Sequence, residues 1–118
     1  MNDATQAEPL PLLDYIDRTD ALRAGQARAE QAADHAERSE HGWREQALEA
    51  VRRHALRNER FLAEHVKVPV PTGVTRCSIG AIMPAARRAG WIVADGYALD
   101  SYGSPKTAWR SLIYGGAA

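Results

Sequence analysis

The sequence predicts an α+β domain, mainly helical, in which three helices are closed by a C-terminal β-hairpin and preceded by one additional helix. Three observations support this prediction. Apolar residues recur at helical spacing in segments between residues 42 and 90, and glycine or proline separates these segments. After Gly90 the pattern changes to the two-residue alternation of β-strands. The turn sequence Gly103-Ser104-Pro105 divides that alternation into two strands.

The composition is that of an ordinary soluble domain. The chain has 118 residues, of which 45% are hydrophobic and 25% charged, so we expect one domain with one core. No apolar run is long enough for a membrane span and the first residues lack a signal sequence, which predicts a cytoplasmic protein without membrane contact. The single Cys77 forms no internal disulfide, and with four His residues it gives no zinc-type spacing, so neither a metal nor a cofactor is expected.

Two N-terminal segments precede the predicted domain, which spans residues 41–114. Residues 1–11 are polar and end in Pro9-Leu10-Pro11, which predicts a disordered tail. Residues 12–40 are rich in helix formers, with Thr19 and Asp20 as the N-cap. One face of this helix carries mostly small residues, namely Leu22, Gln26, Ala29, Ala33 and Ala36. The sequence leaves four alternatives open for this face: packing on the domain, pairing with a second copy, docking on a partner, or solvation.

The first two helices of the domain are predicted at residues 43–57 and 61–68. The buried stripe of the longer helix consists of Trp43, Ala47, Ala50, Val51 and His54. His54 is interpreted as a hydrogen-bonded residue at the core boundary rather than as a catalytic base, because the local pattern places no carboxylate or nucleophile beside it. The shorter helix follows from the apolar residues after Phe61 and ends at Pro69.

The third helix is predicted at residues 76–89, with Thr75 as N-cap and Gly90 as the left-handed residue after its end. Its buried stripe is Ile79, Ile82, Met83 and Ala86. The outward side then carries Arg76, Gly80, Ala81, Pro84 and Arg88, with Arg87 at its margin. Pro84 would fall in the middle of this helix, where proline costs about 3 kcal/mol unless the helix bends.

The hairpin is predicted from two alternating segments. Residues 91–93 and 97–101 form one strand with an interruption at 94–96, and residues 107–114 form the returning strand. Asp95 and Asp100 are assigned to turn formation and edge protection. Residues 115–118 are expected to be flexible, and the three Trp residues are expected in the core because each lies on an apolar stripe or strand.

A helix, a short helix, a third helix and a hairpin describe the winged helix-turn-helix fold, in which the third helix enters the major groove of DNA and the hairpin contacts the flanking backbone. Guanidinium groups pair with guanine or phosphate, and hydroxyl groups position the backbone. From Gly73 onward the chain has five basic and two acidic residues. The candidate DNA-binding residues are Thr75, Arg76, Arg87, Arg88, Tyr102, Lys106 and Arg110.

Three short segments also carry a resemblance: Gly80-Ala81-Ile82-Met83, Arg88-Ala89-Gly90-Trp91-Ile92 and Trp109-Arg110-Ser111-Leu112. They resemble small winged helix-turn-helix proteins encoded by phages and prophages of actinobacteria, over about residues 43–112. The resemblance implies DNA binding in phage replication or regulation. It assigns Arg76 and Arg88 to the recognition helix, and Lys106 and Arg110 to the hairpin. Pro84 departs from the basic or polar residue usual at that position, which puts the DNA fit of the helix in doubt.

Two functions follow as expectations. The first is a DNA-binding phage or prophage protein that acts on double-stranded DNA as a regulator or as an accessory factor in replication or recombination, with a homodimer compatible with paired half-sites. The alternative is a protein-interaction module that binds a host or phage protein through residues 12–39 and the kinked third helix, which the zero net charge and Pro84 favour. An enzyme is not expected, because the sequence holds no phosphate loop, nucleophile elbow or paired acid–base motif.

Overall fold

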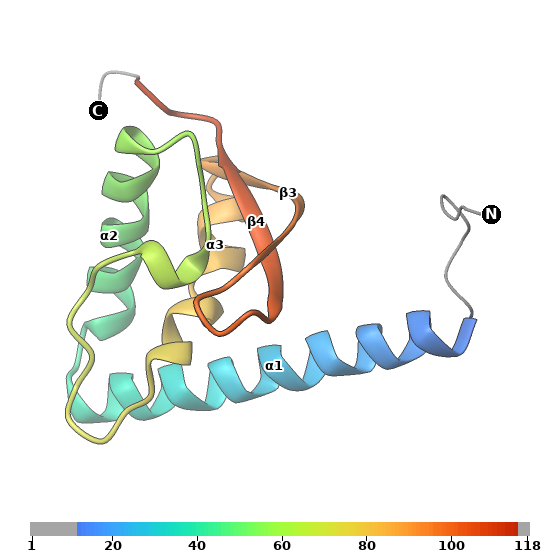
Figure 1. The fold of residues 1–118 in the computed structure, drawn as a ribbon. Coiled ribbons are helices and arrows are strands. Elements are labelled where there is room, and N and C mark those ends of the chain that lie inside the picture. The colour runs from blue at the N-terminus through green and yellow to red at the C-terminus, as the bar shows by residue number, and fades with distance from the viewer. Residues whose placement is uncertain (1–11, 116–118) are drawn as a thin grey trace.

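The computed structural model describes residues 12–115 and confirms an α+β fold, with three α-helices and a three-stranded antiparallel sheet (Figure 1). The predictions for residues 1–11 and 116–118 lie outside the described residues. The helical elements are α1 (Leu12–Ser39), α2 (Trp43–Arg57), the 3₁₀ helices η1 (Ala63–His65) and η2 (Arg76–Ala81), and α3 (Met83–Arg88). The strands are β2 (Arg60–Phe61), β3 (Ile92–Leu99) and β4 (Pro105–Ser111). In the part that the structure describes, every helix is too short or too polar to cross a membrane.

The second half of helix α1 confirms the predicted small-residue face, whereas Gln26, predicted on the same face, is exposed. Ala29, Ala33 and Ala36 are buried, and this part of the helix packs mainly against η2 (Figure 1). Seven residues before Ala29, the Leu22 side chain is 43% exposed. The N-cap predicted at Thr19 is wrong, because the helix begins at Leu12 and continues through residue 19 without a break.

The junction between α1 and α2 is held by the carboxylate of Glu37. Gly42 turns the chain with a φ of 89° and occupies the N-cap position before α2. One Glu37 oxygen accepts a hydrogen bond from the Arg44 N–H at 3.0 Å, and the other accepts one from the Gly42 N–H at 2.8 Å. The side chain therefore satisfies two donors at the start of α2 and meets the positive end of its dipole. These two bonds, that of Arg44 first, hold the pKa of Glu37 below its ordinary value.

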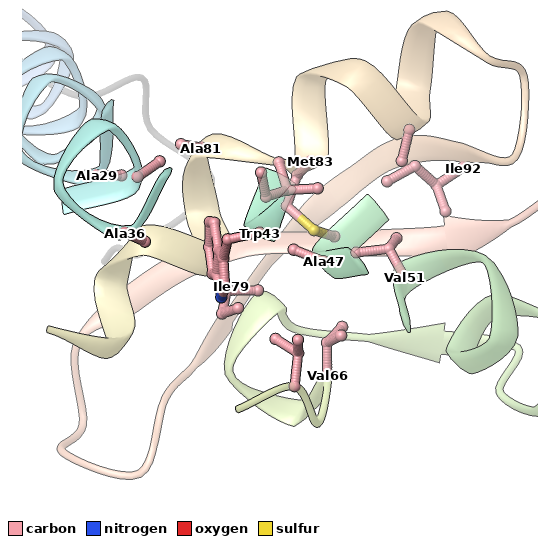
Figure 2. Packing of buried hydrophobic residues seen from close by; sticks show 14 of the residues in the cluster. Ala29, Ala36, Trp43, Ala47, Val51, Val66, Ile79, Ala81, Met83 and Ile92 are labelled. Atoms are coloured by element: carbon pink, nitrogen blue, oxygen red, sulfur yellow. The ribbon is translucent and has the colours of Figure 1, made fainter. Parts of the chain in front are cut away.

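The core is built around α2, as its apolar stripe predicts. Trp43, Ala47 and Val51 are fully buried (Figure 2), and so is Ala55 in the next turn of the helix. The Trp43 indole N–H donates to the Pro69 carbonyl at 2.9 Å, so this polar group keeps a partner inside the core.

The helix predicted at residues 61–68 is wrong. Residues 60–61 form the short strand β2, in which Phe61 pairs with Trp109 of β4, and only η1 follows as a single 3₁₀ turn. The backbone of Leu62 is extended, and its N–H donates to Nδ1 of His65. Pairing with β4 therefore determines the conformation of an apolar run too short to form a stable helix by itself. The sheet order is β2-β4-β3.

The helix predicted at residues 76–89 is divided into η2 and α3 at Ile82. Pro84 lies in the first turn of α3 rather than in the middle of a helix. A proline there costs little, because the first turn of a helix has no acceptor for its missing N–H. The energetic cost expected of a proline in the middle of a helix is therefore absent, because the helix is divided at Ile82 instead of being bent at Pro84. Gly90, with a φ of 83°, ends α3 as predicted.

The C-terminal hairpin confirms two strands with an interruption in the first, but β4 runs from Pro105 to Ser111 rather than over 107–114, and β3 ends at Leu99 rather than at Ser101. β3 and β4 pair antiparallel from Ile92↔Ser111 to Leu99↔Pro105, with a bulge between Ala94 and Tyr97. Gly96 takes a φ of 74° in this bulge, and this left-handed backbone conformation explains why glycine occupies the position. At the base of the hairpin the buried Ser111 hydroxyl donates to the Ala55 carbonyl at 2.6 Å and joins β4 to α2.

We expect Ser111→Ala to lower the free energy of unfolding by about 1–3 kcal/mol, because it removes the only side-chain donor that the described residues offer to this buried carbonyl. Urea unfolding followed by tryptophan fluorescence measures the change. The control is Ser104→Ala in the exposed turn, whose hydroxyl bonds to none of the described residues. An equal loss in both variants would contradict the role of the Ser111 bond.

We expect Glu37→Gln to destabilise the fold at neutral pH and to lose its effect in acid. The folded pKa of Glu37 is lowered, so the carboxylate stabilises the fold above its ordinary value of 4.5, and this stabilisation disappears as pH falls through the lowered value. Thermal melts of both proteins between about pH 7 and about pH 3 test this. The control Glu40→Gln changes a neighbouring exposed carboxylate. If the difference in melting temperature between wild type and Glu37→Gln were the same at the lowest pH as at neutral pH, the capping role of the Glu37 carboxylate would be ruled out.

Candidate nucleic-acid interface

The structure corrects the face predicted for the third helix. Ala81 was expected on the outward side but is buried, and a Cβ on Gly80 would lie 3.6 Å from the Cβ of Ala29 in α1. The predicted buried stripe is confirmed, because Ile79, Ile82, Met83 and Ala86 are all buried. The difference is that η2 packs against α1 on a second side, which covers Gly80 and Ala81 as well. Helix α1 therefore covers part of the surface that was assigned to DNA.

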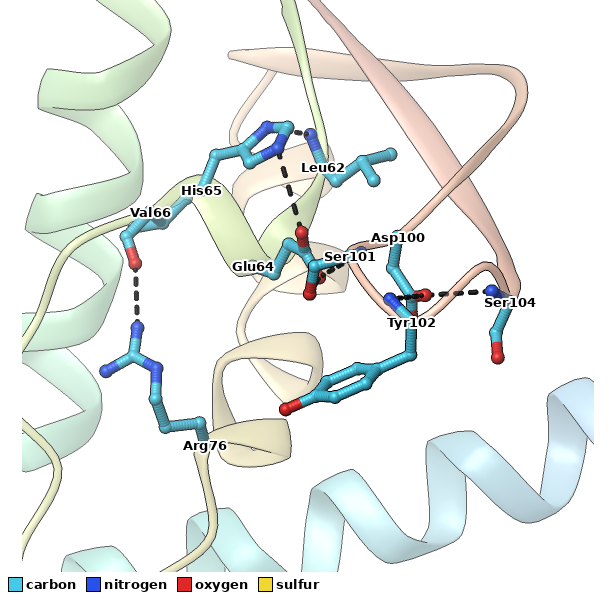
Figure 3. Close-up of polar contacts among 9 residues, drawn as sticks. All are labelled: Leu62, Glu64, His65, Val66, Arg76, Asp100, Ser101, Tyr102 and Ser104. Carbon is cyan, nitrogen blue, oxygen red and sulfur yellow. Dashed lines mark hydrogen bonds and ion pairs between the residues drawn. The ribbon is translucent and has the colours of Figure 1, made fainter.

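Thr75 and Arg76 stand at the start of η2 and make contacts within the protein, of which Figure 3 shows the one between Arg76 and Val66. The Arg76 guanidinium donates to the carbonyls of Val66 and Val68, each at 3.2 Å. Thr75 occupies the N-cap position as predicted, but its hydroxyl lies 2.9 Å from the Cys77 sulfur and makes no capping bond. Arg76 thus holds the preceding loop against η2 and has fewer N–H groups left for a phosphate.

Arg87 and Arg88 lie in the last turn of α3, immediately before the hairpin. Both side chains are exposed, and neither forms an ion pair or hydrogen bond with another described residue. Their position at a helix C-terminus is electrostatically favourable for cations. Of the seven predicted residues, these two arginines present guanidinium groups that the described part of the protein does not already occupy.

Tyr102 and Lys106 lie at the other end of the hairpin, as expected for its tip. Tyr102 is 92% exposed, and Lys106 is exposed at the start of β4. Asp100 shapes the turn by accepting the N–H groups of Ser104 at 2.8 Å and Tyr102 at 2.9 Å (Figure 3). Its pKa is lowered first by the Ser104 bond and then by Tyr102, which supports its predicted role in turn formation.

Arg110 and Arg60 share one acidic partner. Arg60 is not among the seven residues that the sequence predicted for DNA binding. The Asp95 carboxylate lies 3.3 Å from Nε of Arg60 and 3.9 Å from Nε of Arg110. Strand alternation places Arg110 on the face of the sheet opposite to Trp109 and Phe61, which pack on the core. Arg110 is thus partly neutralised and lies across the sheet from the core side, on which α3 packs.

Charge is segregated along the chain, although the formal sum is zero. Residues 43–115 contain eleven Lys or Arg and six Asp or Glu, a formal charge of +5. Residues 12–40 contain four basic and seven acidic residues, a formal charge of −3. The body that carries the hairpin is therefore basic and α1 is acidic, and counting charges by segment reveals this from sequence alone.

His54 lies at the core boundary as predicted, but it is not satisfied there. Its Nε2 atom is buried and has no hydrogen-bond partner among the described residues, and its ring meets Phe61 edge-on at a centroid distance of 4.6 Å. Burial, and then the positive charges of His65 and Lys67, lower the pKa of His54. No three metal-ligating side chains gather in the part of the chain that the structure describes.

No protein-family model, curated protein or solved structure matches this chain.

We expect wild-type stability to fall as pH decreases from about 7.5 to about 5, and His54→Leu to flatten that dependence. Because the folded pKa of His54 is lowered, the unfolded chain takes up its proton first, near the ordinary value of 6.5, and the loss is complete below the folded value. Melting temperatures across this range measure the slope. His35→Leu, on the exposed face of α1, is the control and should keep the wild-type slope. If the melting temperature of His54→Leu depended on pH as steeply as that of wild type, titratable groups other than His54 would be responsible for the pH dependence.

Proposed function

We propose that this protein is a winged helix-turn-helix DNA-binding protein without catalytic turnover, acting as a regulator or as an accessory factor in replication or recombination. The chain order helix, short strand, short helix, helix and hairpin fits this fold, with α2, η1 and the η2–α3 segment as its three helices. The sheet order β2-β4-β3 places the first short strand beside the last strand of the hairpin, which gives the hairpin a fixed base on the core.

The observation that carries the proposal is the adjacent pair Arg87 and Arg88. They are exposed and unpaired among the described residues, on the helix that leads into the hairpin and in a body with a formal charge of +5. A surface of this kind attracts the phosphate backbone, and phosphate contacts supply most of nonspecific affinity. Because α1 covers Gly80, the DNA contact is assigned to the C-terminal end of α3 rather than to η2.

A protein-interaction module is the second candidate. It is favoured by three large apolar side chains that the hairpin exposes, Tyr97, Leu99 and Tyr102, and by the exposed Leu22 on α1. Such residues contribute little to DNA affinity and much to protein contacts.

Fluorescence anisotropy with a labelled random-sequence duplex tests the DNA proposal at about 50 and 200 mM salt. We expect wild-type affinity to fall steeply with salt. In Arg87→Ala/Arg88→Ala the slope of log affinity against log salt should decrease by about 1.8, since each lost phosphate contact contributes about 0.9. The matched control removes two exposed arginines from α1, Arg28→Ala/Arg38→Ala, and should keep the wild-type slope.

Absence of wild-type binding at the lower salt would overturn the proposal and leave the protein-interaction module. Equal losses in the two double variants would show nonspecific attraction to total charge and would remove α3 as the contact.

A further inference from the structure

The outer face of the sheet, which points away from the core, carries two arginines side by side. Arg60 of β2 and Arg110 of β4 are direct cross-strand partners, and Val93 of β3 continues the row. This row lies on the side opposite to Phe61 and Trp109, which pack on the core. The side chain of Arg60 is 49% exposed and that of Arg110 is 51% exposed. Solvent therefore reaches both guanidinium groups.

The two guanidinium groups converge on a single carboxylate oxygen. Oδ2 of Asp95 lies 3.3 Å from Nε of Arg60 and 3.9 Å from Nε of Arg110. Because β4 lies between β2 and β3, the Arg60 side chain crosses β4 to reach the bulge of β3. There its Nη2 also donates to the carbonyl of Asp95 at 3.0 Å. Both arginines thus already approach one oxygen atom of an anion.

One carboxylate does not balance this pair, here called the sheet cluster together with Asp95. Like charges directly opposite each other on neighbouring strands destabilise a sheet, and the cluster combines two positive charges with one negative charge. Among the described residues, none accepts a hydrogen bond from the guanidinium of Arg110 or from Nη1 of Arg60. The cluster therefore keeps one positive charge and several unused N–H donors on the same exposed face.

A second cluster in the chain has the same formal charge but a different geometry. The Glu49 carboxylate of α2 pairs with Arg52 and Arg53. Arg52 donates to both oxygens of this carboxylate, at 2.9 and 2.6 Å, so its guanidinium fork is already occupied. Arg52 and Arg53 are also successive residues of a helix, and such residues do not face each other. Only in the sheet cluster do the two arginines stand opposite each other.

We propose that Arg60 and Arg110 form a binding site for one phosphate group on the outer face of the sheet, and that Asp95 limits its affinity. Guanidinium groups match phosphate oxygens in both geometry and charge. The phosphate group belongs either to a nucleic-acid backbone or to a small phosphate ester, which present the same oxygens. The site is separate from the contact proposed for α3, because α3 packs on the core side of the sheet. The inference therefore does not rest on the proposed function.

Nuclear magnetic resonance with inorganic phosphate as the probe tests the site. The backbone amides of residues 93–96 serve as reporters, and sodium chloride at equal ionic strength is the reference. We expect saturable shifts in wild type and none in Arg60→Gln/Arg110→Gln. Asp95→Asn should tighten phosphate binding about fivefold, because it removes one repulsive unit charge at about 4 Å in a water-like medium.

The matched control is Glu49→Gln, which removes one negative charge from the α2 cluster. It changes the total charge by the same amount as Asp95→Asn but should leave the phosphate affinity reported by residues 93–96 unchanged. Circular dichroism and thermal melts check that each variant is folded.

Duplex titration by fluorescence anisotropy identifies the source of the phosphate group. For a nucleic-acid backbone, Arg60→Gln/Arg110→Gln should decrease the slope of log affinity against log salt by about 0.9, because one phosphate contact is lost. Asp95→Asn should then raise duplex affinity more than Glu49→Gln does. An unchanged slope, or no duplex binding at all, together with saturable phosphate shifts assigns the site to a small phosphate ester.

Three results would overturn the proposal. The first is the absence of saturable phosphate shifts even in Asp95→Asn, and the second is their persistence in Arg60→Gln/Arg110→Gln. The third is an equal gain in phosphate affinity in Asp95→Asn and Glu49→Gln, which would show attraction to total charge. None of these results depends on Arg87 or Arg88, so failure of this site and failure of the DNA-binding proposal are distinguishable.

Discussion

The burial of Trp43 is the constraint on which the rest of the fold depends. This residue is the first of α2, and its fully buried ring belongs to the same core cluster as Ala36 of α1 and Ile79 of η2 (Figure 2). Its indole N–H holds the Pro69 carbonyl, so the loop between η1 and η2 is fixed at the same point. One large side chain thus joins three elements in a core whose α1 and α2 faces are otherwise mostly alanine.

The elements that the sequence predicted well are those in which local chemistry and packing agree. α2 has a strong apolar stripe, Gly90 is needed for a left-handed turn, and Gly96 marks a bulge in an otherwise regular strand. The wrong elements are those in which a distant partner decides the conformation. β2 has two residues and exists because β4 offers Phe61 a pairing partner, and no local pattern of that length distinguishes strand from helix.

The candidate site was predictable in composition but not in arrangement. Exposed arginines near the hairpin follow from the sequence, and so does the basic body once charges are counted by segment. The role of Arg76 was not predictable, because its carbonyl acceptors belong to a loop eight to ten residues earlier. The division of the helix at Ile82 is consistent with Pro84, since proline offers no N–H to the Gly80 carbonyl and its ring would crowd that carbonyl in a continuous α-helix. The packing of Gly80 against α1 is a long-range contact that the apolar stripe does not indicate.

The contact between α1 and η2 has a consequence for local stability. It is made largely by alanine and glycine, which permit close approach but bury little apolar area per residue. The free energy that holds α1 on the domain is therefore smaller than that of the core around α2. Amide hydrogens of α1 will exchange with solvent through partial openings that leave α2 protected, with protection rising along the helix toward Glu37. We therefore expect the longest described helix to open in parts, separately from the core around α2.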